Sequence, residues 1–254
     1  MRPLFSPRGL RVLRESFNGK GPPLIGFDFD GTLAPLVRDP LRARMRRLTR
    51  ARLARLADSA PVAVISGRRL EDLEPRVSGL RLVAVVGSHG IEPFFRSKRL
   101  AARALRWHRA VGPLLEGIPE VRVEYKRYGF AVHYRGAHRP ALAKRRIQRV
   151  LAGMDDMRIM WGSRIADIVP LGAPAKNDGL ERIRRRTGAR QVIYVGDDTT
   201  DEDVFRAGIA EGWLTIRVGE GRETHARYYV RKQQEIDRLL STLIDLTTRS
   251  SSEP

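Results

Sequence analysis

Short unbroken apolar runs alternate, in the first part of the chain, with longer segments whose apolar residues recur every three or four positions. Such runs are typical of strands buried on both faces, and the longer segments are typical of amphipathic helices. The pattern predicts strand 24–27, helix 40–57, strand 62–65, helix 70–76 and strand 82–86. Strands that alternate with helices favour a parallel sheet with right-handed crossovers, so we expect a doubly wound α/β fold.

The pattern changes after Glu92, where a helix followed by two short strands occurs twice. The expected elements are helix 100–115, strands 121–125 and 130–134, helix 139–151, and strands 157–161 and 165–169. Strands joined by short turns form hairpins, so this sheet is expected to be at least partly antiparallel. We therefore expect an inserted α+β cap domain, αββ repeated twice, at 98–171, within a core domain made of 1–97 and 172–254.

The α/β alternation returns in the last part of the chain. The expected elements are helix 178–186, strand 191–195, helix 200–207, strand 214–218 and helix 231–246. The polar residues 247–254 lack apolar positions that could pack, so this tail is expected to be disordered.

The composition of the 254 residues, 42% hydrophobic and 30% charged, is that of a globular protein. No apolar run approaches the roughly 18 residues of a membrane span, and the N-terminus lacks the apolar core of a secretory signal. Its arginine-containing, acid-poor start leaves a transit peptide open as an alternative. Because the chain has no cysteine, it has no disulfides or thiolate metal sites. We expect a soluble, cytoplasmic protein without membrane association.

The formal net charge of +19 raises the question of a nucleic-acid partner. Dense basic runs lie at 42–55, 96–109 and 182–190, and each overlays an apolar helical period. This is the pattern of solvated, arginine-rich helix faces, and no zinc finger or RNA-binding signature accompanies it. Nucleic acid is therefore not the expected partner, although attraction of an anionic small substrate fits the charge.

Two acidic clusters each follow a predicted strand. Asp28 and Asp30 follow the first strand, and Asp197, Asp198 and Asp201 follow the strand that ends at Val195. Carboxyl ends of parallel strands meet at one crevice, so these clusters are expected to converge. A carboxylate such as Asp28 can attack phosphorus and form an aspartyl-phosphate, while Asp30 can act as general acid and base. A surface turn with an Asp cap is the alternative for the first cluster alone.

A divalent cation would relieve the repulsion between the clusters. Mg²⁺ prefers hard oxygen ligands, and the best candidates are Asp28, the backbone carbonyl of Asp30, and Asp197. Asp198 and Asp201 are expected to support these ligands by hydrogen bonds or to cap the following helix. A calcium EF-hand is excluded, because this loop lacks the Gly at its sixth position and the Glu at its twelfth.

Further phosphate ligands are expected between the clusters. The Thr32 hydroxyl, Ser66, Gly67 and Lys176 all lie in predicted loops or helix starts where hydroxyl, amide and ammonium groups meet a phosphate. Ser66 taken alone is equally explained as a helix cap, and Lys176 as a surface lysine. A serine-hydrolase role is not supported, since no G-x-S-x-G surrounds Ser66.

In order along the chain, these motifs resemble those of the haloacid dehalogenase superfamily, large-cap type. Within it, the chain resembles the trehalose-6-phosphate phosphatases. The segments that carry the resemblance are 26–40 (GFDFDGTLAPLVRDP), 87–92 (GSHGIE), 124–126 (EYK), 133–135 (HYR) and 196–205 (GDDTTDEDVF). It spans about residues 24–220, and the ordered combination is more specific than any single motif.

The resemblance implies roles for individual residues. Asp28 would be the nucleophile, Asp30 the general acid and base, and Asp197 a Mg²⁺ ligand, with Ser66 and Lys176 on the phosphate. Arg68 and His89 would face the substrate from the core, and Glu124 and Lys126 would hold sugar hydroxyls from the cap. A simple ion pair on a solvated hairpin face is the alternative for Glu124 and Lys126.

The resemblance also implies the reaction: hydrolysis of trehalose 6-phosphate to trehalose and phosphate through an aspartyl-phosphate with Mg²⁺, the last step of trehalose biosynthesis. The substrate would be a sugar phosphate, and pairing with a trehalose-phosphate synthase is conceivable. Two positions depart from the family pattern, namely Asp167 where Glu is usual, in a substrate-binding position, and Asn177 where Gly is usual. The alternatives are therefore phosphatases of sucrose phosphate or glucosylglycerol phosphate, and a non-catalytic protein that binds anions or nucleic acid.

Overall fold

The computed structural model describes residues 1–19, 21–37, 39–221 and 223–250 of the chain. Its internal contacts divide the chain into two units, of which the first is Met1–Gly90 with Ala175–Pro254 and the second is Ile91–Pro174. The sequence-based boundaries at 97/98 and 171/172 lie inside the second unit. Among the described residues, none of the helices combines the length and apolar character that a membrane span needs.

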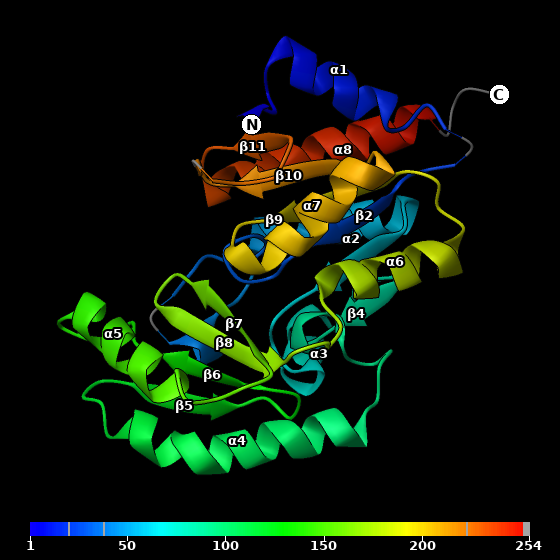
Figure 1. The fold of residues 1–254 in the computed structure, drawn as a ribbon. Coiled ribbons are helices and arrows are strands. Elements are labelled where there is room, and N and C mark those ends of the chain that lie inside the picture. The colour runs from blue at the N-terminus through cyan, green and yellow to red at the C-terminus, as the bar shows by residue number, and fades with distance from the viewer. Residues whose placement is uncertain (20, 38, 222, 251–254) are drawn as a thin grey trace. The chain divides into compact units, whose positions relative to one another are not determined.

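A parallel sheet forms the centre of the first unit (Figure 1). In the described part of the chain its seven strands run in the order β1-β11-β10-β9-β2-β3-β4, and every neighbouring pair is parallel. The strands are β1 (Arg2–Pro3), β2 (Leu24–Phe27), β3 (Val62–Ile65), β4 (Ala84–Val86), β9 (Val192–Gly196), β10 (Leu214–Val218) and β11 (Tyr228–Val230). β2, β3 and β9 are buried along their whole length, as their continuous apolar runs require.

Helices cover both faces of this sheet. They are α1 (Pro7–Glu15), α2 (Arg47–Ser59), α3 (Leu70–Val77), α6 (Lys176–Thr187), α7 (Glu202–Glu211) and α8 (Ile236–Ser250), with short 3-10 turns η1 (Pro40–Arg42), η2 (Ser88–Gly90), η3 (Thr199–Asp201) and η4 (Gln233–Glu235). On one face, α1, α2, α3 and α8 share a hydrophobic core with the strands. On the other face, Leu180 of α6 packs at Gly26 and Phe205 of α7 packs on the Tyr194 ring. The predicted doubly wound α/β fold is confirmed.

The second unit is an antiparallel sheet with helices on one face. It contains α4 (Lys98–Glu116), β5 (Arg122–Tyr125), β6 (Phe130–His133), α5 (Pro140–Leu151), β7 (Met157–Gly162) and β8 (Ile165–Pro170). The strand order is β5-β6-β8-β7, and all three pairs are antiparallel. Apolar side chains of α4 and α5 form a core with Phe130, Val132, Ala166 and Ile168. The predicted αββ repeat is therefore confirmed.

The predicted helix 40–57 is wrong in its first part. The chain forms only the short turn η1, and the α-helix begins at Arg47. Between them, Ala43 has an extended backbone with ψ of 124°, and Ala43 and Met45 both pack into the core. Residues two apart point to one side in extended chain, so this backbone lets both side chains contact the core.

Both ends of the chain contain structure that the apolar pattern did not predict. The expected disordered tail 247–254 is wrong up to Ser250, because α8 continues to that residue and Thr247 is buried. Residues 251–254 lie outside the described part. The sequence analysis also missed β1, α1 and β11; β1 pairs with β11, two short strands at an edge that carry little periodicity of their own.

Candidate active site

The carboxyl ends of β2 and β9 bring the two acidic clusters together. From β2 the chain extends the sheet through β3 and β4 on one side, and then returns through β9 on the other side. This is a topological switch point, where the loops after adjacent strands part and leave a crevice. Asp28 directly follows β2 and Asp197 directly follows β9, so both lie at the crevice.

The loop after β2 is a tight turn that needs its glycine. The Gly31 N–H donates to the Ala34 carbonyl at 2.7 Å, and the Ala34 N–H donates to the Phe29 carbonyl at 2.8 Å. Gly31 has a φ of +83°, and a Cβ there would collide with the Asp197 carboxylate. Glycine therefore permits both the turn and the close approach of the second acidic cluster.

A buried lysine connects the nucleophile candidate to a second carboxylate. Lys176 Nζ lies 2.8 Å from Asp28 Oδ1 and 2.8 Å from Asp201 Oδ1. Lys176 is 2% exposed and Asp201 0%, so these ion pairs are shielded from water. Burial raises the pKa of Asp28 to about 7, because it and the Asp201 charge outweigh the lowering effect of Lys176. The alternative of a surface lysine at 176 is excluded.

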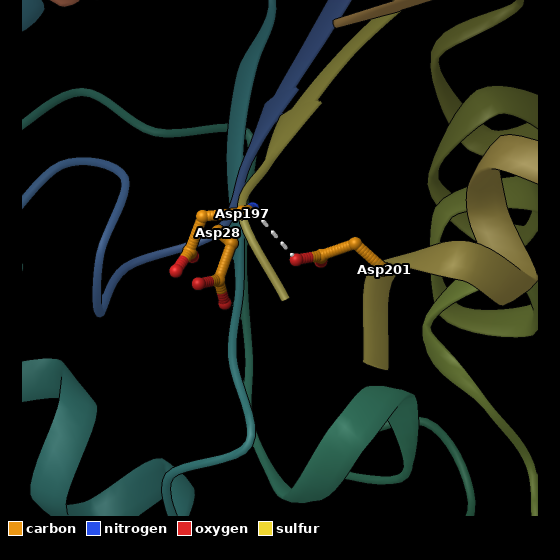
Figure 2. A group of neighbouring side chains, drawn as sticks. All are labelled: Asp28, Asp197 and Asp201. Atoms are coloured by element: carbon orange, nitrogen blue, oxygen red, sulfur yellow. Dashed lines mark hydrogen bonds between the residues drawn. The ribbon is translucent and has the colours of Figure 1, made fainter. Parts of the chain in front are cut away.

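Three carboxylates converge beside this lysine. One oxygen each of Asp28, Asp197 and Asp201 lies within 4.8 Å of the others. Figure 2 shows the Asp28 and Asp197 carboxylates beside one another, with Asp201 pointing toward them from the start of a helix. Burial and the charges of Asp28 and Asp201 raise the pKa of Asp197 well above its usual range. Hard oxygen donors that repel one another at this spacing fit a divalent cation, so the triad could bind one.

Asp201 already has most of its hydrogen-bonding capacity filled by protein groups. Its Oδ2 accepts from the backbone N–H groups of Asp197 and Asp198, both at 3.0 Å. Its Oδ1 accepts from Lys176 and from the Tyr194 hydroxyl at 2.7 Å. Asp198 accepts from the Thr199 N–H at 2.8 Å at the start of η3. Asp201 thus organises the loop, which leaves Asp28 and Asp197 as the more available cation ligands.

Asp30 is held by an arginine fork. Arg68 Nε and Nη2 donate to the two oxygens of Asp30 at 2.6 and 2.8 Å, and Arg68 Nη1 donates to Asp72 at 2.7 Å. Burial lowers the pKa of Arg68, but Asp30 and Asp72 raise it by more, so the guanidinium stays charged. This fork places the Arg68 guanidinium at the candidate general acid, and the expected role of Arg68 in facing the substrate stays a prediction.

The remaining core residues named from the sequence also lie near the crevice. The Ser66 Oγ accepts from the Arg68 N–H at 3.3 Å, and the His89 N–H donates to the Ser66 carbonyl at 3.0 Å. A Cβ at Gly67 would collide with the His89 ring. The Thr32 hydroxyl donates to Asp197 Oδ1 at 3.3 Å. Ser66 does not cap α3, because the N-cap position of that helix is Arg69.

The substrate-binding candidates of the second unit form two side-chain pairs, Glu124 with His133 and Lys126 with Asp167. Glu124 Oε2 lies 2.7 Å from His133 Nε2, and Lys126 Nζ donates to Asp167 Oδ1 at 2.7 Å. Burial raises the pKa of Glu124, but His133 and Lys126 outweigh it and lower the pKa below its usual value. Glu124 and Asp167 are both opposite Ala131 in the register, so the two carboxylates share one face with a small residue between them.

The family of the chain follows from a match over most of its length. The trehalose-phosphatase family model matches residues 26–234, a range that includes every site residue described above. The chain belongs to the trehalose-phosphatase family.

A curated relative supports the same membership. The trehalose-phosphate phosphatase of Mycolicibacterium paratuberculosis (strain ATCC BAA-968 / K-10) is 40% identical over 200 residues, which cover 73% of this chain and 51% of the relative. This trehalose-phosphatase family chain thus spans about half the length of the curated relatives it matches.

Solved structures agree with this family on the fold. The crystal structure of a trehalose-6-phosphate phosphatase related protein is 25% identical, with a TM-score of 0.69 over 89% of this chain and 99% of that one. A sugar phosphatase of haloacid dehalogenase subclass IIB is 16% identical, with a TM-score of 0.57 over 86% of this chain and 98% of its own. The resemblance to the trehalose-phosphatase family is confirmed, and the haloacid dehalogenase-like core is confirmed as a fold.

Two polar residues of this trehalose-phosphatase chain were missed by the sequence analysis. Gln233 Nε2 donates to the Thr32 carbonyl at 2.8 Å and so ties η4 to the loop of Asp28 and Asp30. Tyr194 donates to Asp201 from inside β9. A polar-tipped aromatic in a buried strand is a signal that could have revealed Tyr194. No local pattern marks Gln233, since its partner lies about 200 residues away in the sequence.

Proposed function

We propose that the chain is a phosphatase that hydrolyses trehalose 6-phosphate to trehalose and inorganic phosphate, with Mg²⁺ as the cation. The observation that carries the proposal is the contact of Asp28 with Lys176 at 2.8 Å beside Asp197, in a chain of the trehalose-phosphatase family. The names of the curated relatives supply the sugar, and the acidic triad supplies the place for the cation.

In the first step an Asp28 oxygen attacks the phosphorus, and the bond between phosphorus and the sugar oxygen breaks. An aspartyl-phosphate forms on Asp28, and Asp30 donates a proton to the departing sugar oxygen. Lys176 contributes positive charge beside Asp28, which favours the deprotonated form of the attacking carboxylate and balances charge on the phosphoryl oxygens.

In the second step water attacks the phosphorus of the aspartyl-phosphate. Asp30, now a carboxylate, accepts the proton from this water, and the bond between phosphorus and Asp28 breaks to release inorganic phosphate. In this second step the Arg68 fork on both oxygens of Asp30 fixes the orientation of the carboxylate that accepts the proton. Ser66, Gly67 and Thr32 are proposed to donate to the phosphoryl oxygens.

Asp28, Asp197 and the backbone carbonyl of Asp30 are proposed to hold the Mg²⁺, with Asp198 and Asp201 supporting the loop. When bound, the cation supplies positive charge that neutralises the transferring phosphoryl group. Mg²⁺ fits this donor set better than a thiophilic metal, because the cluster offers only carboxylate oxygens and the chain has no cysteine.

Sugar recognition is proposed for the polar sheet face of the second unit. Glu124 and Asp167 offer acceptors for sugar hydroxyl groups, and Lys126 offers a donor. Arg68 and His89 are proposed to contact the substrate from the first unit, as the family resemblance implies. In the structure Glu124 lies against His133, and Lys126 donates to Asp167.

Phosphatase activity on sucrose phosphate or glucosylglycerol phosphate is the second candidate, and Asp167 is the observation that favours it. Asp is one methylene shorter than the Glu usual in the family, and Asn177 replaces the usual Gly. We further propose a cytoplasmic location and functional pairing with a trehalose-phosphate synthase, without nucleic acid as a partner.

A substrate panel tests the proposal. We expect Mg²⁺-dependent phosphate release to have the highest kcat/KM on trehalose 6-phosphate, with sucrose phosphate and glucosylglycerol phosphate lower by about tenfold or more. Asp167→Glu should change these ratios, while Asp155→Glu, at an exposed position of the same unit, should not. A higher kcat/KM on another sugar phosphate would contradict the substrate and leave the chemistry standing.

A further inference from the structure

Tyr194 is buried in the parallel sheet, and its hydroxyl contacts Asp201 of the acidic triad. The residue lies in β9 and is 0% exposed. Its partner in the register on β2 is Gly26, where a Cβ would lie 2.9 Å from the Tyr194 ring. Phe205 of α7 meets the ring edge-on at 6.1 Å. A glycine in the middle of a buried central strand is unfavourable by itself, and here it makes room for the ring.

The Tyr194 hydroxyl and the Lys176 ammonium share one oxygen. Tyr194 donates to Asp201 Oδ1 at 2.7 Å, and Lys176 reaches the same oxygen at 2.8 Å. Burial and the Asp201 and Asp28 charges raise the pKa of Tyr194 well above its usual range. The hydroxyl therefore keeps its proton and acts as a donor.

Because Asp201 Oδ1 accepts from both groups, Tyr194 affects the relative strength of the hydrogen bonds from Lys176 to Asp201 and to Asp28. Asp201 Oδ2 is fixed by two backbone N–H groups, so the position of Oδ1 depends on Tyr194 and Lys176. A second donor on Oδ1 withdraws part of its negative charge, which weakens the hold of Asp201 on the ammonium. Lys176 is then more available to Asp28 Oδ1, 2.8 Å away.

We propose that Tyr194 is a positioning residue that acts through Asp201 to hold Lys176 against Asp28. This inference rests on the proposed phosphatase function, because it concerns the stabilisation of the phosphoryl group during transfer. The Tyr194 hydroxyl donates to Asp201, which is not among the proposed cation ligands Asp28 and Asp197. Its effect is expected on kcat rather than on substrate binding.

The test is Tyr194→Phe, which removes only the hydroxyl. The matched control is Tyr228→Phe, in β11 of the same sheet and 3% exposed. For Tyr194→Phe we expect kcat on trehalose 6-phosphate to fall about tenfold to a hundredfold, the size of one hydrogen bond to a charged group, with KM changed less than about threefold. Thermal unfolding monitored by circular dichroism checks that both variants fold.

A second measurement distinguishes an effect of Tyr194→Phe on Lys176 from an effect on Mg²⁺ binding. Calorimetric titration with MgCl₂ should give the same affinity, within about twofold, for Tyr194→Phe and wild type. A kcat within about twofold of wild type, or a kcat restored by saturating Mg²⁺, would overturn the positioning role. If the wild type releases no phosphate from any sugar phosphate, the proposed function fails instead, so the two failures are distinguishable.

Discussion

At the scale of single residues, the site is a network of charges that must be balanced. Asp28, Asp197 and Asp201 would repel one another in a buried site, and Lys176 compensates for only part of this charge. The pKa values of Asp28 and Asp197 are raised because protonation removes part of this excess negative charge. Binding of a divalent cation is the other way, so protons and cation compete.

This competition predicts a pH-dependent affinity for Mg²⁺. Burial and Asp201 raise the pKa of Asp28 to about 7 without a cation, so below this pH the carboxyl must lose a proton before Mg²⁺ binds. The apparent affinity should fall about tenfold for each pH unit below 7 for one proton, and should rise as the pH increases. Calorimetric titration at about pH 5.5 and about pH 8 measures this. Equal affinities at both values would contradict the competition.

The Arg68 fork on Asp30 predicts that a substitution of Arg68 lowers activity even when it keeps the positive charge. Arg68→Lys keeps one positive charge but cannot donate to both oxygens of Asp30. We expect kcat to fall by about tenfold or more, since the orientation of the general acid is lost. Phosphate-release kinetics measure the change.

A neighbouring arginine provides the control for this substitution. Arg69 pairs with Glu71, whose side chain is exposed, at 2.7 Å, and Arg69→Lys should leave kcat within about twofold of wild type. Equal effects of the two substitutions would mean that the fork on Asp30 has no special role.

At the scale of elements, a tether joins the start of the last helix to the catalytic loop. Gln233 in η4 donates to the Thr32 carbonyl at 2.8 Å and accepts from Arg46 at 3.2 Å. The loop that carries Asp28 and Asp30 is thus held by its own turn and by a residue far away in sequence. Loss of this contact would leave the Thr32 carbonyl without its side-chain donor.

The tether predicts a measurable effect of Gln233→Leu. Removing the carboxamide should lower the free energy of unfolding by about 1 kcal/mol and reduce kcat severalfold, because the loop gains freedom. Gln234→Leu, at the exposed neighbouring position, is the matched control and should change neither quantity. Chemical denaturation and initial rates measure the two effects; an unchanged kcat would show that the turn alone positions the loop.

Most elements could be predicted from the sequence, because burial imposes a period on the apolar residues. The runs at 24–27 and 62–65 are strands in the structure, and the change after Glu92 marks the antiparallel sheet. The start of α2 could not be predicted in this way, since Ala43 and Met45 contact the core although the chain at Ala43 is extended and not helical. The period of the apolar residues indicates which side of a helix or strand is buried, but it does not indicate which tertiary contact buries that side.

The location of the site residues could be predicted from the sequence, whereas most of their side-chain partners could not. Asp28, Asp197 and Lys176 could be placed in one crevice, because strand ends of a parallel sheet converge. The partners of Arg68 and Lys126 could not be predicted: Arg68 contacts Asp30 and Lys126 contacts Asp167, each across a long stretch of sequence. Such pairings depend on side-chain geometry, which carries no periodic signal.

At the scale of the whole molecule, the chain combines a parallel-sheet unit that carries the acidic triad with an inserted sheet that carries the Glu124–His133 and Lys126–Asp167 pairs. In the function proposed above, the phosphoryl-transfer chemistry belongs to the first of these units. The net charge of +19 is compatible with an anionic substrate, but it is spread over many helices and identifies no partner by itself.

The most direct test of the central claim compares wild type with Asp28→Asn for Mg²⁺-dependent phosphate release from trehalose 6-phosphate. Asparagine keeps the shape of the side chain but is a poor nucleophile, so we expect selective turnover by wild type and a loss of about a thousandfold or more in the variant. Turnover that survives in Asp28→Asn, or no phosphate release by wild type from any sugar phosphate, would contradict it.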